Sequence, residues 1–312
     1  MIKVAIQGEK GSYSECATVD FFRGQEIQPV TCVDYSELFE RVDSGEADCM
    51  VIPIENSSAG SVFPYYDLLL EYATGHGFRA TAELKLRIRH NLIGHPDADL
   101  DQVKLVHSHF QALDQCRGFL RSRGLSAQAV YDTAGAAKQI KATGRKDVAA
   151  VASAQAAHDL GMKILARNIQ DQTDNYTRFL RVEKNPASVA ASDGRTKVSV
   201  VFCIPNIPGS LFRTTAAFGS RADVSVIRIE SRPLVGTATK WHKFVRPHSE
   251  GQDEGVWDLL YYLDFETPEK KRQAVLDHLS ELVMEVDGAV ALQVLGTYPT
   301  GPLRDITGER WR

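Results

Sequence analysis

Short apolar runs alternate with amphipathic segments through the first part of the chain, which is the pattern of strands followed by helices. Apolar runs at 3–8, 28–33 and 48–54 predict strands, and the segments at 14–23 and 34–42 predict helices between them. The run at 48–54 is continuously apolar, as expected for a strand that is buried on both faces. This alternation predicts a mainly parallel sheet with helices on both faces.

The same alternation returns after residue 103, and a different kind of segment precedes it. Residues 84–93 alternate apolar and polar side chains, which predicts a half-exposed strand. The segments that follow are predicted strands at 103–107, 128–131, 147–153 and 177–182 and predicted helices at 111–124, 133–144 and 154–161. We therefore expect an α/β fold with two lobes that are joined by crossover strands.

A small, polar stretch that contains Pro186 and Gly194 predicts a linker. Six predicted elements follow in the order strand, helix, strand, strand, helix, strand, at 197–204, 210–221, 224–233, 257–266, 268–286 and 290–298. This βαββαβ order is that of the ferredoxin-like fold. The predicted organisation is a first domain at 1–184, a linker at 185–196, a second domain at 197–300 with a polar insertion at 236–256, and a tail at 301–312.

Composition and charge narrow the classes of function. The 312 residues are 43% apolar and 24% charged, as in an ordinary globular protein, and the net charge of −4 provides no field for nucleic acid or an acidic membrane. No apolar run approaches the roughly 20 residues that span a bilayer. The five cysteines are not at metal-ligand spacing, and His107 and His109 have no third ligand nearby. We expect a soluble, cytoplasmic protein that binds neither nucleic acid nor membrane and holds no metal.

Open α/β sheets bind ligands beyond the carboxyl ends of their strands, and four polar clusters fall at, near or beside such positions. In the first cluster, Gly8 and Gly11 allow close backbone approach. The hydroxyls of Ser12 and Ser14 lie near a predicted helix N-terminus, which favours anions. A tight turn between strand and helix explains this cluster at least as well.

The second cluster, at 53–62, is more polar than a turn requires. Glu55, Asn56 and Ser57 come directly after a buried strand, and capping of the next helix explains only Ser61. This cluster therefore favours a functional role over a structural one.

The third cluster, at 107–116, contains Ser108 at the end of a predicted strand. Gln111 and Gln115 follow it on one face of a predicted helix. A solvated helix start is an equal alternative for this cluster.

The fourth cluster is DQTDNYTRFL, residues 171–180. The Thr177 hydroxyl can donate a hydrogen bond, and the Arg178 guanidinium can bind a carboxylate through two hydrogen bonds. Because strand residues alternate, these two side chains should point to opposite faces. Arg178 either binds a substrate or forms a structural ion pair between the lobes.

No cluster contains a Ser-His-Asp relay, a Cys-His pair or a carboxylate dyad. The polar groups are hydroxyls, amides and a guanidinium. Such a set suits a substrate that needs orientation, anion binding and one assisted bond cleavage rather than a strong base.

The clusters occur in the order seen in prephenate dehydratases, which this chain resembles over about residues 2–300. The motifs that carry the resemblance are GEKGSYSE, VIPIENSSAGSV, HSHFQALDQC, DTAGAA and IQDQTDNYTRFL. Two later segments, PNIPGSLFRTTAAF and IRIESRP, resemble the ACT regulatory module of that family. Several motifs in register are specific, whereas any one alone would be weak.

The resemblance implies a catalytic domain of two α/β lobes, like a type II periplasmic binding protein, with the site between the lobes. It implies that the enzyme removes CO2 and water from prephenate to give phenylpyruvate, on the route to phenylalanine. It further implies that phenylalanine binds the ACT module at a subunit interface and inhibits, so we expect a homodimer or homotetramer. No metal or organic cofactor is implied.

The resemblance also assigns roles to residues. Thr177 is expected to donate a proton or hydrogen bond to the departing hydroxyl, and Asn56, Ser108 and Gln115 match positions that line the cleft. Arg178 is a candidate carboxylate anchor, and Glu55 is expected to be structural or to tune the leaving-group side. Further substrate contacts are expected from Ser12, Ser14, Ser57, Thr133 and Phe179. The expected effector residues are Asn206, Pro208, Gly209, Ser210, Leu211, Glu230, Ser231, Arg232 and Pro233.

Three features depart from the family pattern. Phe110 stands where Pro is usual, Gly135 stands where Glu is usual, and the insertion at 236–256 is longer than is common. The first departure concerns the loop that carries Ser108, and the third concerns effector binding.

Three alternatives to prephenate dehydratase stay open. An arogenate dehydratase performs the same elimination on the amino analogue, and nothing in the sequence decides between the two substrates. A non-aromatising prephenate decarboxylase is disfavoured by Thr177 and by the ACT module. A non-catalytic amino-acid sensor is disfavoured by the intact set of Thr177, Asn56 and Gln115.

Overall fold

The computed structural model describes residues 1–187, 194–204, 208–219, 221–233, 259–285 and 290–305. The chain forms two compact units, and each combines segments that are separate in the sequence. Unit 1 comprises residues 1–65, 84–181 and 302–312, and unit 2 comprises residues 66–83 and 182–301. None of the described helices is long and apolar enough to cross a membrane.

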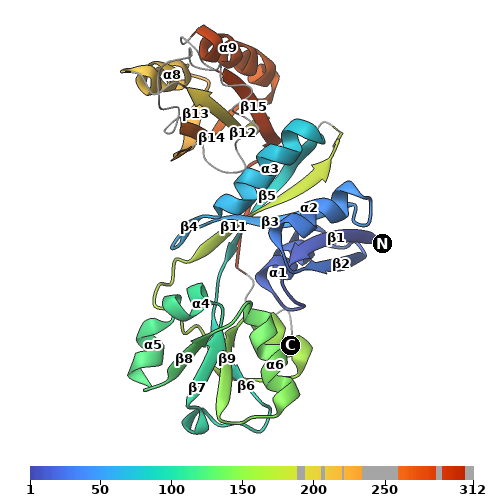
Figure 1. Ribbon diagram of the computed structural model, residues 1–312, viewed down its shortest axis with the longest axis vertical. Helices are drawn as coiled ribbons and strands as arrows, with labels where there is room; N and C mark the ends of the chain where they lie inside the picture. The colour runs from blue at the N-terminus through green and yellow to red at the C-terminus, as the bar shows by residue number, and fades with distance from the viewer. Residues whose placement is uncertain (188–193, 205–207, 220, 234–258, 286–289, 306–312) are drawn as a thin grey trace, which may run out of the picture. The chain divides into compact units, whose positions relative to one another are not determined.

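Lobe A of unit 1 contains the blue N-terminal elements of Figure 1. Its elements are β1 (Ile2–Gln7), α1 (Tyr13–Phe21), β2 (Ile27–Cys32), α2 (Tyr35–Asp43), β3 (Cys49–Asn56), β4 (Gly60–Ser61), β16 (Leu303–Arg304) and the unit 1 parts of β5 (Phe78–Arg87) and β11 (Tyr176–Lys184). Strand β1 lies between β2 and β3 and is parallel to both. The core includes Val4, Ile6 and Val51, which are fully buried, so the apolar runs of the first three strands form the centre of the lobe.

Lobe B of unit 1 is built on a separate five-stranded sheet in the order β10-β6-β9-β7-β8 (Figure 1). Its elements are β6 (Asn91–Gly94), β7 (Leu105–Ser108), α4 (Phe110–Gln115), α5 (Arg117–Ser122), β8 (Ser126–Ala129), α6 (Thr133–Thr143), β9 (Val148–Ala152), α7 (Ala154–Leu160) and β10 (Lys163–Ala166). Strand β7 is parallel to β8 and β9, whereas β6 is antiparallel to β9 and β10. The mainly parallel arrangement that we predicted therefore holds for β7, β8 and β9 but not for β6.

The predicted strand at 84–93 is divided into two strands, because this segment is where the chain passes from lobe A to lobe B. Strand β5 ends at Arg87 in one sheet, and β6 begins at Asn91 in the other. Residues 88–90, the first crossover, join them, and residues 167–175, the second crossover, return the chain to lobe A. The two crossovers are joined by hydrogen bonds from Ile88 N to Asn175 O at 2.8 Å and from Ile169 N to His90 O at 2.9 Å.

The predicted single helix at 111–124 is divided into α4 and α5. The carbonyl oxygen of Gln115 accepts a hydrogen bond from Asp171 N at 2.7 Å, and the Asp171 carboxylate accepts one from Gly118 N at 3.0 Å. A residue of the second crossover therefore ends one helix and caps the next. This interaction is long-range and has no signal in the local sequence.

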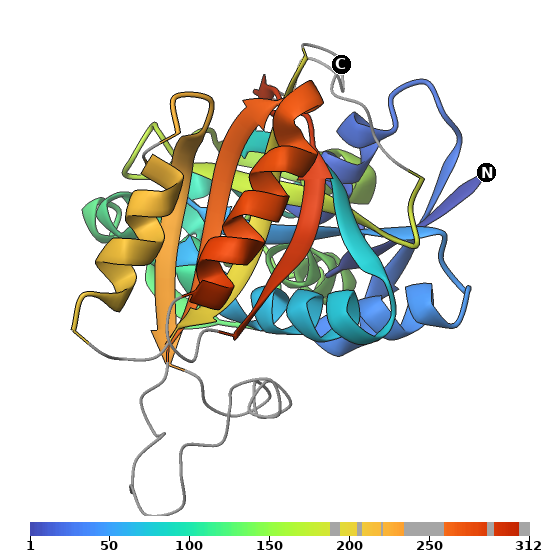
Figure 2. The same cartoon turned by 90° about the horizontal axis from the view of Figure 1, so that it is seen from above.

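Unit 2 has the predicted βαββαβ order. Its elements are β12 (Arg195–Ile204), α8 (Ser210–Gly219), β13 (Ser225–Pro233), β14 (Leu259–Pro268), α9 (Arg272–Glu285) and β15 (Val290–Tyr298), with the unit 2 parts of α3 (Phe63–Gly75), β5 and β11. The strand order β13-β14-β12-β15 is that of a ferredoxin-like sheet, and both described helices, α8 and α9, cover the same face of it (Figure 2). Phe202, Phe218 and Phe265 belong to the core between the helices and the sheet.

The fold class that we predicted is confirmed, with two α/β lobes and a ferredoxin-like α+β unit. Residues 66–83 pack with unit 2 although they precede lobe B in the sequence, and residues 302–305 belong to unit 1 although they follow β15. The domain boundaries at 184 and 197 stay a prediction, and the insertion at 236–256 lies outside the described residues.

Candidate active site

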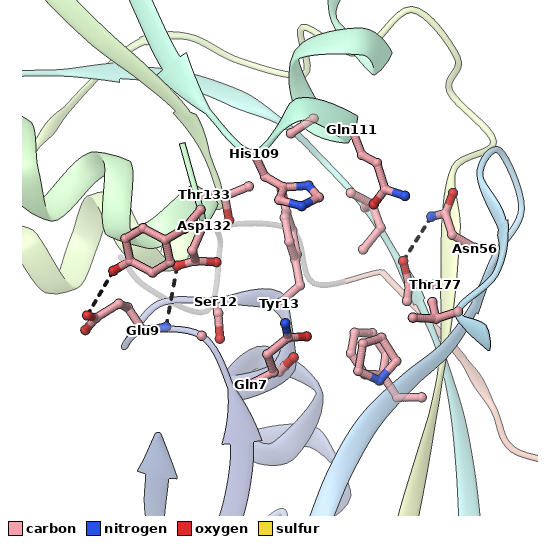
Figure 3. A pocket seen from close by; sticks show the side chains of 18 of the residues that line it. Gln7, Glu9, Ser12, Tyr13, Asn56, His109, Gln111, Asp132, Thr133 and Thr177 are labelled. Atoms are coloured by element: carbon pink, nitrogen blue, oxygen red, sulfur yellow. Dashed lines mark hydrogen bonds between the residues drawn. The ribbon is translucent and has the colours of Figure 1, made fainter. Parts of the chain in front are cut away.

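A cavity of about 440 Å³ is lined by residues from both lobes of unit 1 and from the first crossover. Lobe A contributes the loops after β1 and β3, and lobe B contributes the segments at the start of α4 and α6. Figure 3 shows Thr177 and Asn56 on one side of the cavity and Glu9, Ser12, Asp132 and Thr133 on the other. The cavity is therefore formed where loops from several elements converge.

The loop after β1 lies against lobe B because residue 11 is glycine. Gly11 has φ +88°, and a Cβ there would lie 2.7 Å from the Cα of Ala156, at the start of α7. The Ser153 hydroxyl donates to Gly11 O at 2.6 Å, and the Ser12 hydroxyl accepts from Glu15 N at 3.3 Å to cap α1. These contacts hold Ser12 at the edge of the cavity.

The orientation of the Asn56 side-chain amide follows from the backbone around it. Its Oδ1 accepts hydrogen bonds from Ser58 N and Ala59 N, both at 2.9 Å, and only the carbonyl end of an amide can accept from N–H groups. The Nδ2 group therefore points the other way, where it lies 3.0 Å from Thr177 Oγ1 and 2.8 Å from Asn175 Oδ1. Thr177 consequently accepts from Asn56, and its own hydrogen is left to be donated elsewhere.

The Thr177 hydroxyl lines the cavity and has no second partner among the residues that the structure describes. A hydroxyl has one hydrogen to donate, and here that hydrogen is directed away from Asn56. The arrangement thus presents one polarised hydrogen-bond donor to the cavity.

The orientation of the Asn56 amide also fixes the orientations of Gln115 and His90. The Gln115 Nε2 group donates to Asn56 Oδ1 at 3.4 Å, so Gln115 Oε1 points toward Asn175 Nδ2 at 2.9 Å and His90 Nε2 at 2.8 Å. His90 therefore donates through Nε2, and its Nδ1 lies 3.0 Å from the Tyr13 hydroxyl. The same hydroxyl lies 2.9 Å from Arg89 O, so its one hydrogen is shared between these two acceptors. His90 is a neutral imidazole in this network, because burial lowers its pKa from 6.5 to about 4.

The charges around the cavity are acidic. Among the described lining residues there is no Lys or Arg, whereas Glu9, Asp34 and Asp132 are present. Glu9 accepts a hydrogen bond from Lys138 Nζ at 2.9 Å, which lowers the pKa of Glu9, and another from the Tyr131 hydroxyl at 3.0 Å. Anionic groups of a ligand would thus be bound by hydroxyls, amides and the N-terminal ends of α1 and α6 rather than by a cationic side chain.

Tyr131 occupies the space that a side chain at Gly135, the position where Glu is usual, would require. A Cβ at Gly135 would collide with the ring and hydroxyl of Tyr131, the residue whose hydroxyl donates to Glu9. Gly135 N also donates to the Asp132 carboxylate at 2.8 Å, which caps α6. Phe110, the other departure, is 60% exposed at the start of α4, so it does not fill the cavity.

The sequence of the chain was compared with models of known protein families. The family model for prephenate dehydratase matches residues 4–187. The chain belongs to the prephenate dehydratase family.

Arogenate dehydratase 2 of Petunia hybrida is 40% identical to the chain over 301 residues, which are 96% of this chain and 72% of that protein. Arogenate dehydratase/prephenate dehydratase 2, chloroplastic, of Arabidopsis thaliana is 39% identical over 302 residues, 96% of this chain and 73% of that protein. The structure of prephenate dehydratase from Arthrobacter aurescens in complex with L-Phe superposes with a TM-score of 0.78 at 25% identity, and the match covers 96% of this chain and 90% of that one.

The structure brings most of the predicted site residues of the dehydratase together. The residues that line the cavity are Thr177, Asn56, Gln115, Ser12, Ser14, Thr133 and Phe179. The other four predicted residues, Ser108, Glu55, Arg178 and Ser57, lie outside the lining. Their roles in the reaction stay predictions.

Each of these four residues has a contact that holds the walls of the site. The Ser108 hydroxyl is fully buried and donates to Val151 O at 2.6 Å. Arg178 is 8% exposed on the opposite side of β11 from Thr177, and its Nη1 lies 3.4 Å from Glu55 Oε2. The Ser57 hydroxyl donates to the carbonyl oxygen of residue 174 and accepts from N of residue 176. The contacts of Arg178 and Ser57 connect β3, β11 and the second crossover, and that of Ser108 connects β7 with β9.

The predicted effector residues of the dehydratase lie in unit 2. Gly209, with φ +82°, precedes the buried Ser210 and the partly exposed Leu211 at the start of α8. On β13, Glu230 pairs with Arg228, and Arg232 pairs with Asp67 of α3 at 2.5 Å. Pro208 and Ser231 are exposed in the same two segments. Asn206 lies outside the described residues, and for Pro233 the backbone alone is described.

Sequence reasoning missed His90 and Tyr13 as members of the network. His90 is a lone histidine in a segment that was predicted to be a half-exposed strand, and Tyr13 stands among serines in a turn. Asn175 was recognisable as a polar member of the 171–180 cluster, but its spacing gave no sign that it contacts Asn56.

The depressed pKa of His90 predicts a specific dependence of stability on pH. Between pH 6.5 and about 4, the unfolded chain binds a proton at His90 that the folded chain does not, so folding stability falls as pH falls through this window. Across this window the proton binding lowers the free energy of unfolding by about 3 kcal/mol, and a His90→Gln variant should lack this decrease. Urea unfolding measured at several pH values should give a shallower curve for His90→Gln than for wild type.

The matched control is His158→Gln, because His158 is an exposed histidine on α7. That variant should follow the wild-type pH curve. Parallel curves for wild type and His90→Gln would show that His90 is not held neutral by burial.

Proposed function

We propose that the protein catalyses the loss of CO2 and water from prephenate to give phenylpyruvate. Its membership of the dehydratase family supports this reaction class. The observation that carries the proposal is the Thr177 hydroxyl, which accepts from Asn56 and keeps its hydrogen for a group in the cavity.

The reaction needs little more from the protein than alignment and assistance to the leaving group. The bond from the ring to the carboxylate carbon breaks, and its electron pair moves through the diene of the ring. The bond from the ring to the hydroxyl oxygen then breaks on the far side, and the ring becomes aromatic. The departing oxygen takes a proton and leaves as water.

In this scheme Thr177 donates its hydrogen to the departing oxygen, and a proton from water restores the hydroxyl. The Asn56 Nδ2 group, 3.0 Å from Thr177 Oγ1, stabilises negative charge that develops on that oxygen. A threonine is a weak acid in water, but fixed orientation in a desolvated cavity makes general-acid assistance worth about 10²- to 10⁴-fold. The neutral His90 and Gln115 keep the Asn56 amide in place.

Substitution of Thr177 tests directly whether its hydroxyl contributes to turnover. Thr177→Val keeps the shape and removes the hydroxyl, so we expect kcat to fall about 10²- to 10³-fold with KM changed less than about threefold. Thr177→Ser keeps the hydroxyl and should retain most of the turnover. Formation of phenylpyruvate is followed by its ultraviolet absorbance, and a defect confined to KM would contradict the assigned role.

A second candidate substrate is arogenate, in which an ammonium group replaces the keto oxygen of the side chain. The lining of the cavity favours it, because three carboxylates with no described Lys or Arg attract the ammonium group of arogenate and disfavour the larger net negative charge of prephenate. The two plant relatives bear names that include arogenate dehydratase, which is a statement about those proteins.

Steady-state assays with both substrates decide between them. If the acidic lining selects the substrate, kcat/KM is larger for arogenate, and Asp34→Asn should shift the ratio toward prephenate by about threefold. A larger kcat/KM for prephenate, with no shift in Asp34→Asn, supports prephenate as the substrate. No turnover of either substrate would overturn the proposed function in favour of a sensor.

We further propose that unit 2 is an ACT module that binds phenylalanine and inhibits the reaction. Its ferredoxin-like topology supports this assignment, as does the L-Phe present in the complex of the Arthrobacter aurescens protein. The glycine at 209, where φ is +82°, lets the backbone turn into α8 in a conformation that other residues rarely adopt.

Replacement of Gly209 tests this regulation. Gly209→Ala strains the turn and places a methyl group 2.9 Å from Arg213 Nη1, so inhibition by L-phenylalanine should weaken by about tenfold or more. Gly219→Ala, at the other end of α8, has no atom within 4 Å and should leave inhibition unchanged. Equal inhibition of both variants would place the effector elsewhere.

A further inference from the structure

The segment after β15 returns to unit 1 and adds a strand to lobe A. Strand β16 pairs in parallel with β5, where Leu303 lies opposite Lys85, and Lys85 N donates to Pro302 O at 3.0 Å. Arg304 Nε donates to the Asp20 carboxylate of α1 at 3.0 Å. This segment falls in the predicted tail at 301–312, to which the sequence assigned no role.

The next residue, Asp305, binds Arg87 at the end of β5 and Arg89 in the first crossover. Arg89 donates to both carboxylate oxygens, from Nε at 2.7 Å and from Nη2 at 2.5 Å, and Arg87 donates from Nη1 at 3.4 Å. The hydrogen bonds from Arg89 lower the pKa of Asp305, so the carboxylate is charged throughout the physiological range. Two-point contact of this kind fixes the orientation of a guanidinium as well as its position.

Both arginines also contact the second crossover and the start of β11. Arg87 donates from Nε to Thr173 O and from Nη2 to Asp174 Oδ1, both at 3.1 Å, and its guanidinium lies 5.4 Å from the centre of the Tyr176 ring. Arg89 donates from Nη1 to Asn168 Oδ1 at 3.4 Å. Asp305 therefore holds the two side chains that span from one crossover to the other.

The opposite side of the same four residues faces the cavity. Ile88 and His90 alternate with Arg87 and Arg89, and both line the cavity, as expected for extended backbone. The Ile88 backbone is bonded to Asn175 O, and His90 is bonded to Gln115, so the spacing of the crossovers sets the positions of the groups around Thr177.

We propose that Asp305 is a positioning residue of the dehydratase, which fixes the spacing of the two crossovers through Arg87 and Arg89. It touches no substrate and acts through the two guanidinium groups. The effect on turnover rests on the proposed function, whereas the effect on the crossovers does not.

The experiment compares the full-length wild-type chain with Asp305→Asn, which keeps the shape of the side chain and removes its charge. We expect kcat to fall about three- to tenfold on whichever substrate the wild type uses, with KM changed less than about twofold. Hydrogen exchange of the Ile88 and Ile169 amides, which donate from one crossover to the other, should become faster. Unchanged hydrogen exchange of the β1 backbone amides in Asp305→Asn would show that lobe A of this variant is folded.

Two matched variants separate positioning from a general loss of an ion pair. Asp305→Glu keeps the charge and should recover most of the turnover and the slow exchange. Asp147→Asn removes an equivalent two-point contact, with Arg145 at 2.9 and 2.6 Å on the loop before β9, and should leave turnover unchanged.

The outcomes are distinct. The proposal is overturned by wild-type kcat and exchange in Asp305→Asn, by a defect in KM alone, or by an equal loss in Asp147→Asn. A wild-type protein that converts neither substrate refutes the proposed function, and the exchange of the Ile88 and Ile169 amides then still decides whether Asp305 fixes the crossovers.

Discussion

Two backbone N–H groups, those of Ser58 and Ala59, determine the direction of the hydrogen bonds that run from Thr177 through Asn56 and Gln115 to His90. They fix the Asn56 amide with its oxygen toward the loop and its nitrogen toward Thr177. Gln115 can then bond to Asn56 in one way only, and His90 follows from Gln115. The result is a network of neutral side chains that leaves the Thr177 hydrogen free for a group in the cavity. A neutral network of this kind tolerates burial, whereas a charged residue at the same depth would require a partner inside the cavity.

In the proposed decarboxylative elimination, hydroxyls and amides are sufficient for the cavity to act. The substrate already contains the negative charge and the electron pair that drive the reaction, and aromatisation of the ring provides the free energy. A cationic side chain near the departing carboxylate would stabilise the ground state as much as the transition state and would not raise kcat. Arg178 lies on the other side of β11, in contact with Glu55, so its charge is kept out of the cavity.

The local patterns of the sequence were sufficient for the elements but not for their junctions. The apolar runs of β1, β3 and β12 and the order of the elements in unit 2 were predictable, because burial and period depend on neighbouring residues. The first crossover has the alternation of a strand, and its assignment to two sheets depends on contacts with residues some 80 positions away in the sequence. For the site, the sequence identified Thr177, Asn56 and Gln115, since each belongs to a polar cluster next to a predicted strand. His90 and Asp305 had no such signal, because their importance comes from partners that only the folded chain brings near.

The return of the chain to lobe A by way of β16 has a consequence for how the protein is made. Asp305 is translated roughly 200 residues after Arg89, so at ordinary elongation rates about 10–40 s separate the synthesis of the two arginines from that of their carboxylate, and nearly all of unit 2 is synthesised in that interval. Unit 1 therefore cannot reach its final form on the nascent chain until unit 2 has been synthesised. A maturing polypeptide would gain the last contact of its crossovers only after the ferredoxin-like unit is complete.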